Sequence, residues 1–185
     1  MTDRKITRGK VLLAEPFMLD GNFKRSVILM CEHTSDGSLG FILNKSLDMK
    51  INDLIADFPE IDAPVFYGGP VQTDTIHYIH NVGHLLDDSQ EIMSGIYWGG
   101  NFEQLKVLVK KELILPRNIK FFVGYSGWSK GQLDEELQLG SWIISEMDMN
   151  YVFGKGEKGL WKKVLSNKGD VYTVISQMPD TTSYN

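Results

Sequence analysis

Short apolar runs separated by polar turns dominate the first half of the chain. Three of them, 10–14, 26–33 and 39–44, are rich in aliphatic and β-branched residues, as is typical of strands. A turn signal, Ser35-Asp36-Gly37, stands between the second and third runs, so these two are predicted to form a hairpin. Further strands are predicted over 63–67, 75–82, 90–93, 95–98, 119–125 and 141–146.

Segments with apolar residues at helical spacing are interspersed with these runs. They predict a first helix over 51–58, a second from the N-cap Asn101 to about Glu112, and others over 132–139 and near 160–165. Strands and helices are mixed without a regular βαβ order. We therefore expect an α+β fold in a single domain over 1–185, with residues 1–8 as a flexible tail.

Composition and charge narrow the class of protein. The 185 residues carry a formal net charge of −5 and give a pI of about 5.4, which argues against direct nucleic-acid binding. No apolar run is as long as a membrane span, and the first residues lack the core of a signal peptide. The single cysteine, Cys31, lies in an apolar run and is expected to be a buried structural thiol. These features predict a cytoplasmic protein that does not engage a membrane.

The stretch Phe121–Leu137 is the most informative part of the chain. Its apolar start followed by Gly124, Gly127 and Gly131 predicts a buried strand, a tight glycine loop and a helix start. A backbone this rich in glycine approaches a strand, a ligand or a partner closely, and the residues do not say which.

The same stretch contains an incomplete catalytic motif. Ser126 has the strand and helix context of a nucleophile elbow, but that pattern needs glycine where Trp128 stands. It also needs a downstream histidine, and all four histidines precede Ser126. A serine hydrolase site is therefore not predicted. The acidic run 134–136 is explained by the first turn of a helix, where the macrodipole favours negative charge.

Two other constellations imitate known sites. His77, His80 and His84 have metal-like spacing only on a helix, whereas their segment is predicted as a strand, so no metal site is expected. Residues 154–159 fit G-x-G-x-x-G and follow the strand-like segment 151–153, but the chain ends before a dinucleotide fold is complete, so no cofactor is predicted. The lysines around this segment form a candidate anion patch, for which a solvated helix face is the simpler explanation. The patch comprises Lys155, Lys158, Lys162 and Lys163.

Four segments in this order carry a family resemblance: SVILMCEH, GSLGFILNK, PVFYGGPV and FFVGYSGWSKGQLDEEL. Together they resemble the YqgE/AlgH family of bacterial proteins, from about Gly9 to Trp161. The resemblance implies a bifurcated mixed sheet, partly closed as a small barrel and flanked by helices. It brings no established activity, although some members are labelled transcriptional regulators. Ser126 stands where the family pattern has alanine, which weakens a catalytic role for Ser126 further. Ser46 stands where that pattern often has proline, so its loop lacks the restraint that a proline would give.

Two hypotheses of function remain. The first is a non-catalytic regulatory module that binds a protein or small-molecule partner, and the alternative for the same residues is that they only close the sheet. Its candidate surface comprises Asn44, Gly68, Gly69, Pro70, Gly124, Tyr125, Gly127, Trp128, Gly131 and Gln132. The second is an enzyme of unassigned reaction in the cleft of the glycine loop, with Asn44, Gln132 or Glu135 as polar participants. Neither the partner nor the oligomeric state follows from the sequence.

Overall fold

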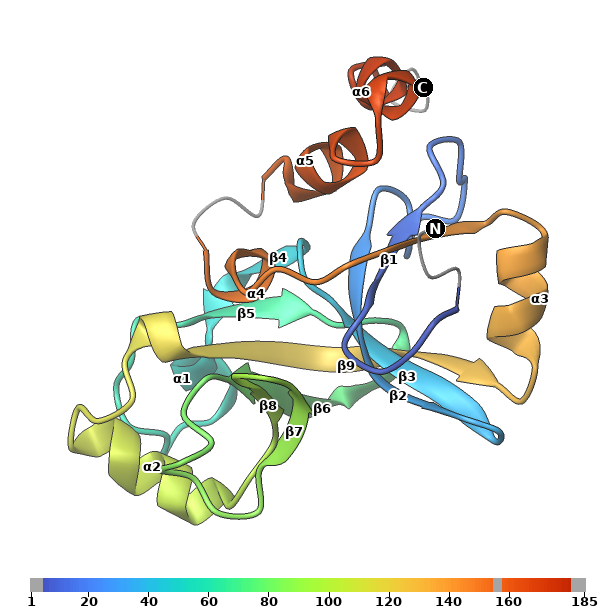
Figure 1. Ribbon diagram of the computed structural model, residues 1–185. Coiled ribbons are helices and arrows are strands. Elements are labelled where there is room, and N and C mark those ends of the chain that lie inside the picture. Colours follow the sequence, from blue (N-terminus) through green and yellow to red (C-terminus); the bar gives the residue numbers. More distant parts are fainter. Residues whose placement is uncertain (1–4, 155–157, 181–185) are drawn as a thin grey trace.

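Strand β9 (Ile119–Ser129) lies at the centre of a ten-stranded sheet (Figure 1). The computed structural model describes residues 5–154 and 158–180. The strand order is β10-β1-β2-β3-β9-β6-β8-β7, with β4 and β5 attached to β9 as a branch. The other strands are β1 (Val11–Ala14), β2 (Val27–Thr34), β3 (Gly37–Ile42), β4 (Ser46–Lys50), β5 (Pro64–Tyr67), β6 (Val71–His80), β7 (Gln90–Met93), β8 (Ile96–Trp98) and β10 (Trp142–Ser145).

The sheet branches because β9 has different neighbours along its two halves. In the first half, β5 pairs with residues 121–123 in parallel, and β6 pairs with residues 119–125 in antiparallel. In the second half, β3 pairs with residues 126–129. The end strands β10 and β7 do not pair with each other, so within the described residues the sheet is open. The expected partly closed barrel is therefore wrong, whereas the mixed α+β fold is confirmed.

Six α-helices flank the sheet in the described part of the chain. They are α1 (Ile51–Leu54), α2 (Phe102–Lys110), α3 (Gln132–Gln138), α4 (Asn150–Phe153), α5 (Leu160–Ser166) and α6 (Asp170–Ser176). In α2 the Asn101 side chain accepts a hydrogen bond from the Gln104 amide, as the N-cap prediction required. The first helix is shorter than expected, since it ends at Leu54. Residues 151–153 were expected to be strand-like and instead belong to α4.

Three apolar clusters hold the helices against the sheet. Helix α5 packs on residues of β1, β2 and β3 through Leu160, Trp161, Val164 and Leu165. Helix α2 packs on residues of β5, β6 and β9 through Leu105, Leu108 and Val109. Figure 1 shows α5 and α6 together at one end of the molecule, away from α2. The third cluster lies around Trp128 and Trp142 and includes Ile6, which is 2% exposed. The tail expected over residues 1–8 therefore does not include Ile6, while residues 1–4 lie outside the described part.

Candidate functional site

The link between β5 and β6 crosses over the backbone of β9. Because β5 and β6 pair with opposite edges of β9, residues 68–70 pass from one edge to the other. The Gly68 amide donates to the Val123 carbonyl at 2.8 Å, and the Ile42 amide donates to the Gly68 carbonyl at 3.0 Å. The GGP segment is therefore a backbone crossing that joins β5, β3 and β6 around β9.

Glycine is required at this crossing because two backbones are in contact. A Cβ on Gly69 would lie 2.2 Å from the carbonyl carbon of Tyr125, and one on Gly68 would lie 2.3 Å from the Gly124 oxygen. Gly124 has φ of +65°, and its Cβ would lie 2.5 Å from the Gly69 oxygen. Gly68, Gly69 and Gly124 are thus brought together, and the close approach that the sequence predicted is to another strand.

The predicted glycine loop is itself mostly strand. Residues 124–129 continue β9, and the turn before α3 is reduced to Lys130 and Gly131. Ser126 is fully buried, and its hydroxyl donates to the Gly68 carbonyl at 3.0 Å. A buried hydroxyl bonded to backbone in an extended strand is not an exposed nucleophile, so Ser126 stabilises the crossing.

Trp128 and Asn44 also serve the fold. Trp128 is 5% exposed, and its indole N–H donates to Glu136 at 2.9 Å. Gln132 accepts from the Ser129 amide and donates to Glu136, which fixes the start of α3. Asn44 accepts from the Val27 amide and donates to the Arg25 carbonyl, both at 2.9 Å. Of the two aromatic side chains in the candidate surface, Trp128 is therefore buried, whereas Tyr125 is half-buried.

A shallow groove, which we call the β9 groove, lies beside the second half of β9. Its volume is about 380 Å³, and its walls come from the β2–β3 hairpin, the start of β6 and β9. Its lining includes Glu32, Asp36, Leu39, Val71, Tyr125, Gly127 and Trp128. The predicted residues Tyr125, Gly127 and Trp128 thus share one hollow, whereas Asn44 and Gly131 do not line it.

The charged side chains that line the β9 groove are all acidic. Glu32 and Asp36 are exposed carboxylates, and no lysine or arginine belongs to the lining. Sequence reasoning missed both residues. The hairpin prediction did place Asp36 in the turn, but the pairing of this hairpin with β9 is a long-range contact that the pattern does not reveal.

A second hollow of about 420 Å³ lies at the end of the same hairpin and contains Gly131. Here the His33 Nδ1 atom lies 2.7 Å from the Ser38 hydroxyl. The two residues are direct cross-strand partners in the β2–β3 ladder, and Ser38 is 9% exposed. The contact is a cross-strand hydrogen bond, and it places a hydroxyl beside an imidazole.

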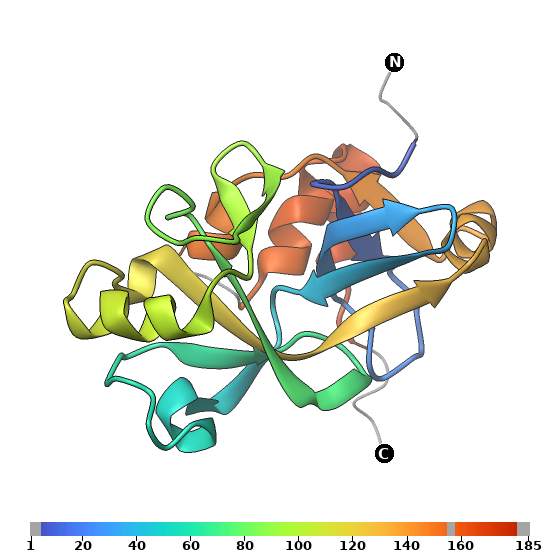
Figure 2. The ribbon, with the colours of Figure 1, turned by 90° about the horizontal axis from the view of Figure 1, so that it is seen from below.

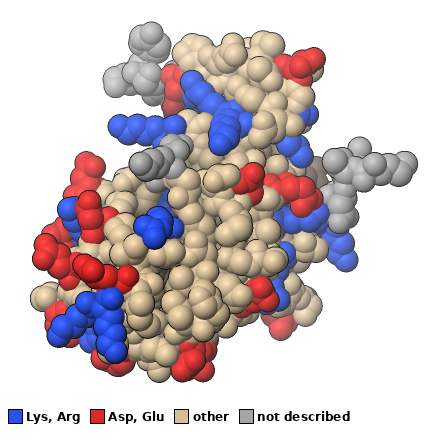
Figure 3. All heavy atoms as spheres, turned by 60° about the vertical axis from the view of Figure 1, so that its left-hand side comes forward, with Lys and Arg blue, Asp and Glu red and all other residues tan. Residues whose placement is uncertain are grey.

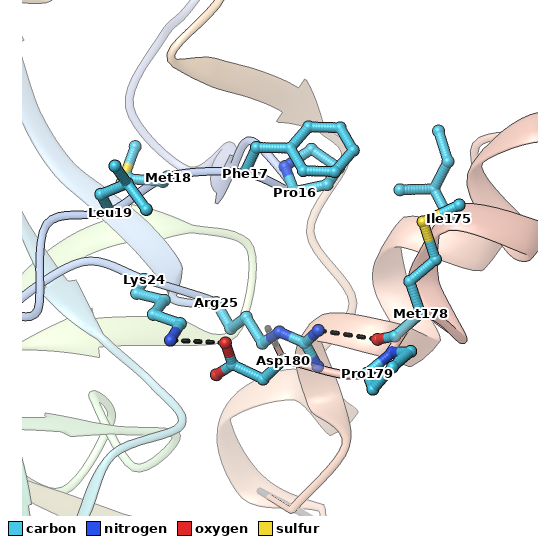
Figure 4. A pocket seen from close by; sticks show the side chains of 10 residues that line it. All are labelled: Pro16, Phe17, Met18, Leu19, Lys24, Arg25, Ile175, Met178, Pro179 and Asp180. Carbon is cyan, nitrogen blue, oxygen red and sulfur yellow. Dashed lines mark hydrogen bonds and ion pairs between the residues drawn. The ribbon is translucent and has the colours of Figure 1, made fainter. Parts of the chain in front are cut away.

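A third hollow, about 140 Å³, lies between the loop around Phe17 and the end of α6 (Figure 4). Its apolar wall includes Phe17, Leu19 and Met178, all exposed. Its basic groups are engaged with the C-terminal segment: Lys24 pairs with Asp180 at 2.5 Å, and Arg25 donates to the Met178 carbonyl at 2.9 Å. The hollow therefore offers apolar surface with its charges already compensated.

The candidate anion patch is only partly described. Lys158, Lys162 and Lys163 are exposed, the last two on α5, while Lys155 lies outside the described residues. On the face that Figure 3 shows, basic and acidic side chains are interspersed, and the blue groups do not merge into one surface. The nearby Lys168 ammonium donates to the Ile144 carbonyl at 2.8 Å, which ties α5 to β10.

The histidines of β6 lie in a strand and pack in aromatic surroundings. His77 contacts Phe41 and Tyr125 with ring centroids 5.2 and 5.9 Å away, and burial lowers its pKa. His80 is fully buried, and burial lowers its pKa as well, against a smaller opposing effect of its hydrogen bond with Gly99. The described residues contain no group of three His, Cys, Asp or Glu side chains placed to hold a metal. Nor does that part of the chain contain a helix with the length and hydropathy to span a bilayer.

The fold and the crossing define a single-domain α+β protein with an open sheet that branches at one glycine-rich strand. A family model described as AlgH-like matches residues 11–173, so the chain belongs to the AlgH-like family. UPF0301 proteins of Chlorobaculum parvum and Chlorobium phaeobacteroides are 43% and 41% identical over 177 and 181 residues. The two alignments cover 96% and 98% of this chain and 95% and 97% of those proteins.

Solved structures show the same fold. A crystal structure of a Corynebacterium diphtheriae protein matches with a TM-score of 0.80 and 22% identity, covering 96% of this chain and 95% of that one. The solution structure of AlgH from Pseudomonas aeruginosa matches with a TM-score of 0.70 and 23% identity, covering 98% and 100%. The family resemblance drawn from the four sequence segments is thereby confirmed.

Proposed function

We propose that this protein is a non-catalytic, cytoplasmic binding module that holds a ligand or partner in the β9 groove and acts in regulation. The observation that carries the proposal is the position of Gly127. Gly127 lines the groove, and β6 pairs with β9 only as far as Tyr125. The main chain of Gly127 is therefore accessible from the β6 side. Recognition sites are typically hollows with an apolar floor and a few polar groups, and Leu39, Val71 and Tyr125 supply that floor.

Gly127 differs from Gly124, the other glycine of β9, because the fold does not require it. A Cβ there would meet only the Cε2 end of the Tyr125 ring at 3.3 Å and the Val71 methyl at 3.6 Å. Its φ is not in the left-handed region, so a larger residue is sterically feasible. A glycine at a position where the fold does not require one leaves room for the close approach of another backbone.

A thermal-shift screen of the purified protein against nucleotides, metabolites and short peptides tests the proposal. A ligand at 100 times its Kd is expected to add about 2.7 kcal/mol of stability. The shift should disappear in Gly127→Val, which fills the groove, and should persist in the matched control Val107→Ala on the exposed side of α2. The proposal is contradicted if no ligand is found, or if Gly127→Val responds as the wild type does.

The second candidate is an enzyme acting at the end of β9, and the His33–Ser38 contact of 2.7 Å favours it. A hydroxyl beside an imidazole is the minimal nucleophile and base pair. Among the described residues no carboxylate is bonded to the other ring nitrogen of His33 to orient it. Hydrolysis of an activated ester that is lost in Ser38→Ala and retained in Ser35→Ala would support this candidate over the binding module.

A further inference from the structure

The second half of β9 has one paired edge and one unpaired edge. Toward β3, residues 126–129 are paired in continuous register. Toward β6, pairing ends at Val71 and Tyr125, and no described strand continues beyond them. Figure 2 shows β3 along one side of this part of β9 and no strand along the other.

The direction of the Gly127 main chain follows from its neighbours. In an antiparallel ladder, alternate residues direct both N–H and C=O to the same side. A Cβ on Gly37 of β3 would lie 2.6 Å from the Trp128 carbonyl oxygen, so Trp128 directs its main chain toward β3. The Ser129 amide donates to the Gln132 side chain instead of to β3. Gly127 precedes Trp128 and has the parity of Ser129, so its N–H and C=O point to the unpaired edge.

The β9 groove adjoins this edge and has an acidic rim. Strands in a sheet lie about 4.8 Å apart, so a strand added beside β9 lies about 10 Å from β3. Because Gly127 has no side chain, a long side chain from the added strand can extend across it over Leu39. At the far side, the carboxylates of Glu32 and Asp36 are exposed, and the lining has no basic residue to neutralise them.

Building on the binding role proposed above, we infer that the occupant is an extended peptide segment of a partner. The segment pairs with Gly127 as an additional strand of the sheet and directs a lysine or arginine toward Glu32 and Asp36. Main-chain hydrogen bonds at an open edge supply affinity, and the acidic rim supplies selectivity. Charge argues against a second copy of this chain or a nucleic acid as occupant, since the chain carries −5 and the rim itself is acidic.

Designed heptapeptides test this inference directly. The probe is Thr-Val-Lys-Val-Lys-Val-Thr with blocked ends, which places both lysines on one face of a strand. The control peptide has the same sequence with glutamate in place of both lysines. We expect the lysine peptide to bind and to shift the amide resonances of Gly127 and Ser129, and the glutamate peptide to bind at least tenfold more weakly.

Two N-methylated versions of the lysine peptide then test strand addition. Each version blocks the amides along one edge only. The version methylated on the edge that faces β9 should lose roughly tenfold in affinity, because about two main-chain hydrogen bonds disappear. The version methylated on the opposite edge should bind normally. Equal binding of both versions, or binding without a shift at Gly127, would overturn the inference.

Charge variants test the acidic rim. The double variant Glu32→Gln with Asp36→Asn should bind the lysine peptide about threefold to tenfold more weakly and with less dependence on salt. The control Asp48→Asn with Glu60→Gln removes the same charge from exposed positions around α1 and should bind normally. An unchanged affinity in the rim variant would overturn the lysine or arginine assignment.

The outcomes separate this inference from the proposed function. If a small molecule binds in a Gly127-dependent manner and no peptide does, the peptide inference is wrong and the binding module stands. If neither binds, both are wrong. Concentration-dependent dimerisation that is lost in Gly127→Val would make a second copy the occupant and also overturn the inference.

Discussion

Trp128 and Trp142 are joined through a single atom. Both indole N–H groups donate to the same Glu136 Oε2 atom, at 2.9 and 2.7 Å, and the two rings meet edge to face with centroids 5.8 Å apart. One carboxylate therefore satisfies two buried donors and fixes α3 against both β9 and β10.

Replacing Glu136 should destabilise the protein. Glu136→Ala leaves two indole donors without this acceptor, each at 5% residue exposure, and we expect a loss of about 2–4 kcal/mol in the free energy of unfolding. Urea denaturation measures it. Glu135→Ala, one residue away and exposed, is the control and should change stability by less than about 0.5 kcal/mol. Equal effects of the two variants would argue against the shared acceptor.

The crossing of residues 68–70 over β9 predicts extreme sensitivity at Gly69. In Gly69→Ala the new Cβ would lie 2.2 Å from the Tyr125 carbonyl carbon, and neither backbone has room to move. We expect at least about 4 kcal/mol of destabilisation or failure to fold, measured by urea denaturation or soluble yield. Gly21→Ala, with nothing within 4 Å of the added atom, should be nearly neutral. A stable Gly69→Ala protein would refute the close contact.

Stability should fall on acidification because His80 is buried in its neutral form. Its ring lies 2.7 Å from the Gly99 carbonyl through Nε2 and accepts from the Val82 amide through Nδ1. Burial lowers its pKa below the unfolded value of about 6.5, so the unfolded chain binds more protons below that pH. Its contribution is fully present above about pH 6.5 and is lost as the pH falls toward the folded pKa.

Unfolding free energies at several pH values check this dependence. The slope below pH 6.5 should include up to about 1.4 kcal/mol per pH unit from His80, with a further part from His77, whose pKa burial also lowers. His80→Asn should remove its share of the slope, whereas exposed His84→Gln should keep the wild-type slope. An identical slope in His80→Asn would exclude His80 as the source.

Cys31 should be unreactive in the folded protein. The thiol is fully buried, and burial raises its pKa, so neither access nor thiolate is available to an alkylating reagent. Iodoacetamide should label Cys31 only under unfolding conditions, as followed by mass spectrometry. Rapid labelling in native buffer would show that β2 opens locally.

Local pattern was sufficient for much of this fold. The β2–β3 hairpin follows from two apolar runs around Asp36-Gly37, and α2 follows from Asn101 and its apolar stripe. The strand prediction for residues 151–153 was wrong. Tyr, Val and Phe favour strands, but the structure places them in a four-residue helix packed on the core. The expectation of a partly closed barrel came from the family resemblance alone, because no local sequence pattern predicts whether a sheet closes.

The candidate site was less accessible to sequence reasoning. Glycines usually mark turns, so Gly124 and Gly127 predicted a loop, whereas the nearby crossing holds residues 124–129 in a strand. The contact that explains Gly124 comes from Gly69, far away in the sequence, and the partner of Trp128 is a glutamate on the next helix. Such long-range pairings leave no periodic signal.

The central position of β9 has a consequence during synthesis. Strands β5 and β6 leave the ribosome first, yet both depend on a strand that begins only at Ile119. Translation proceeds at roughly 5–20 residues per second, so the inner edges of these two strands wait for seconds without their common neighbour. Unpaired strand edges are prone to aggregation, so the nascent chain should require protection by a chaperone most acutely just before β9 emerges.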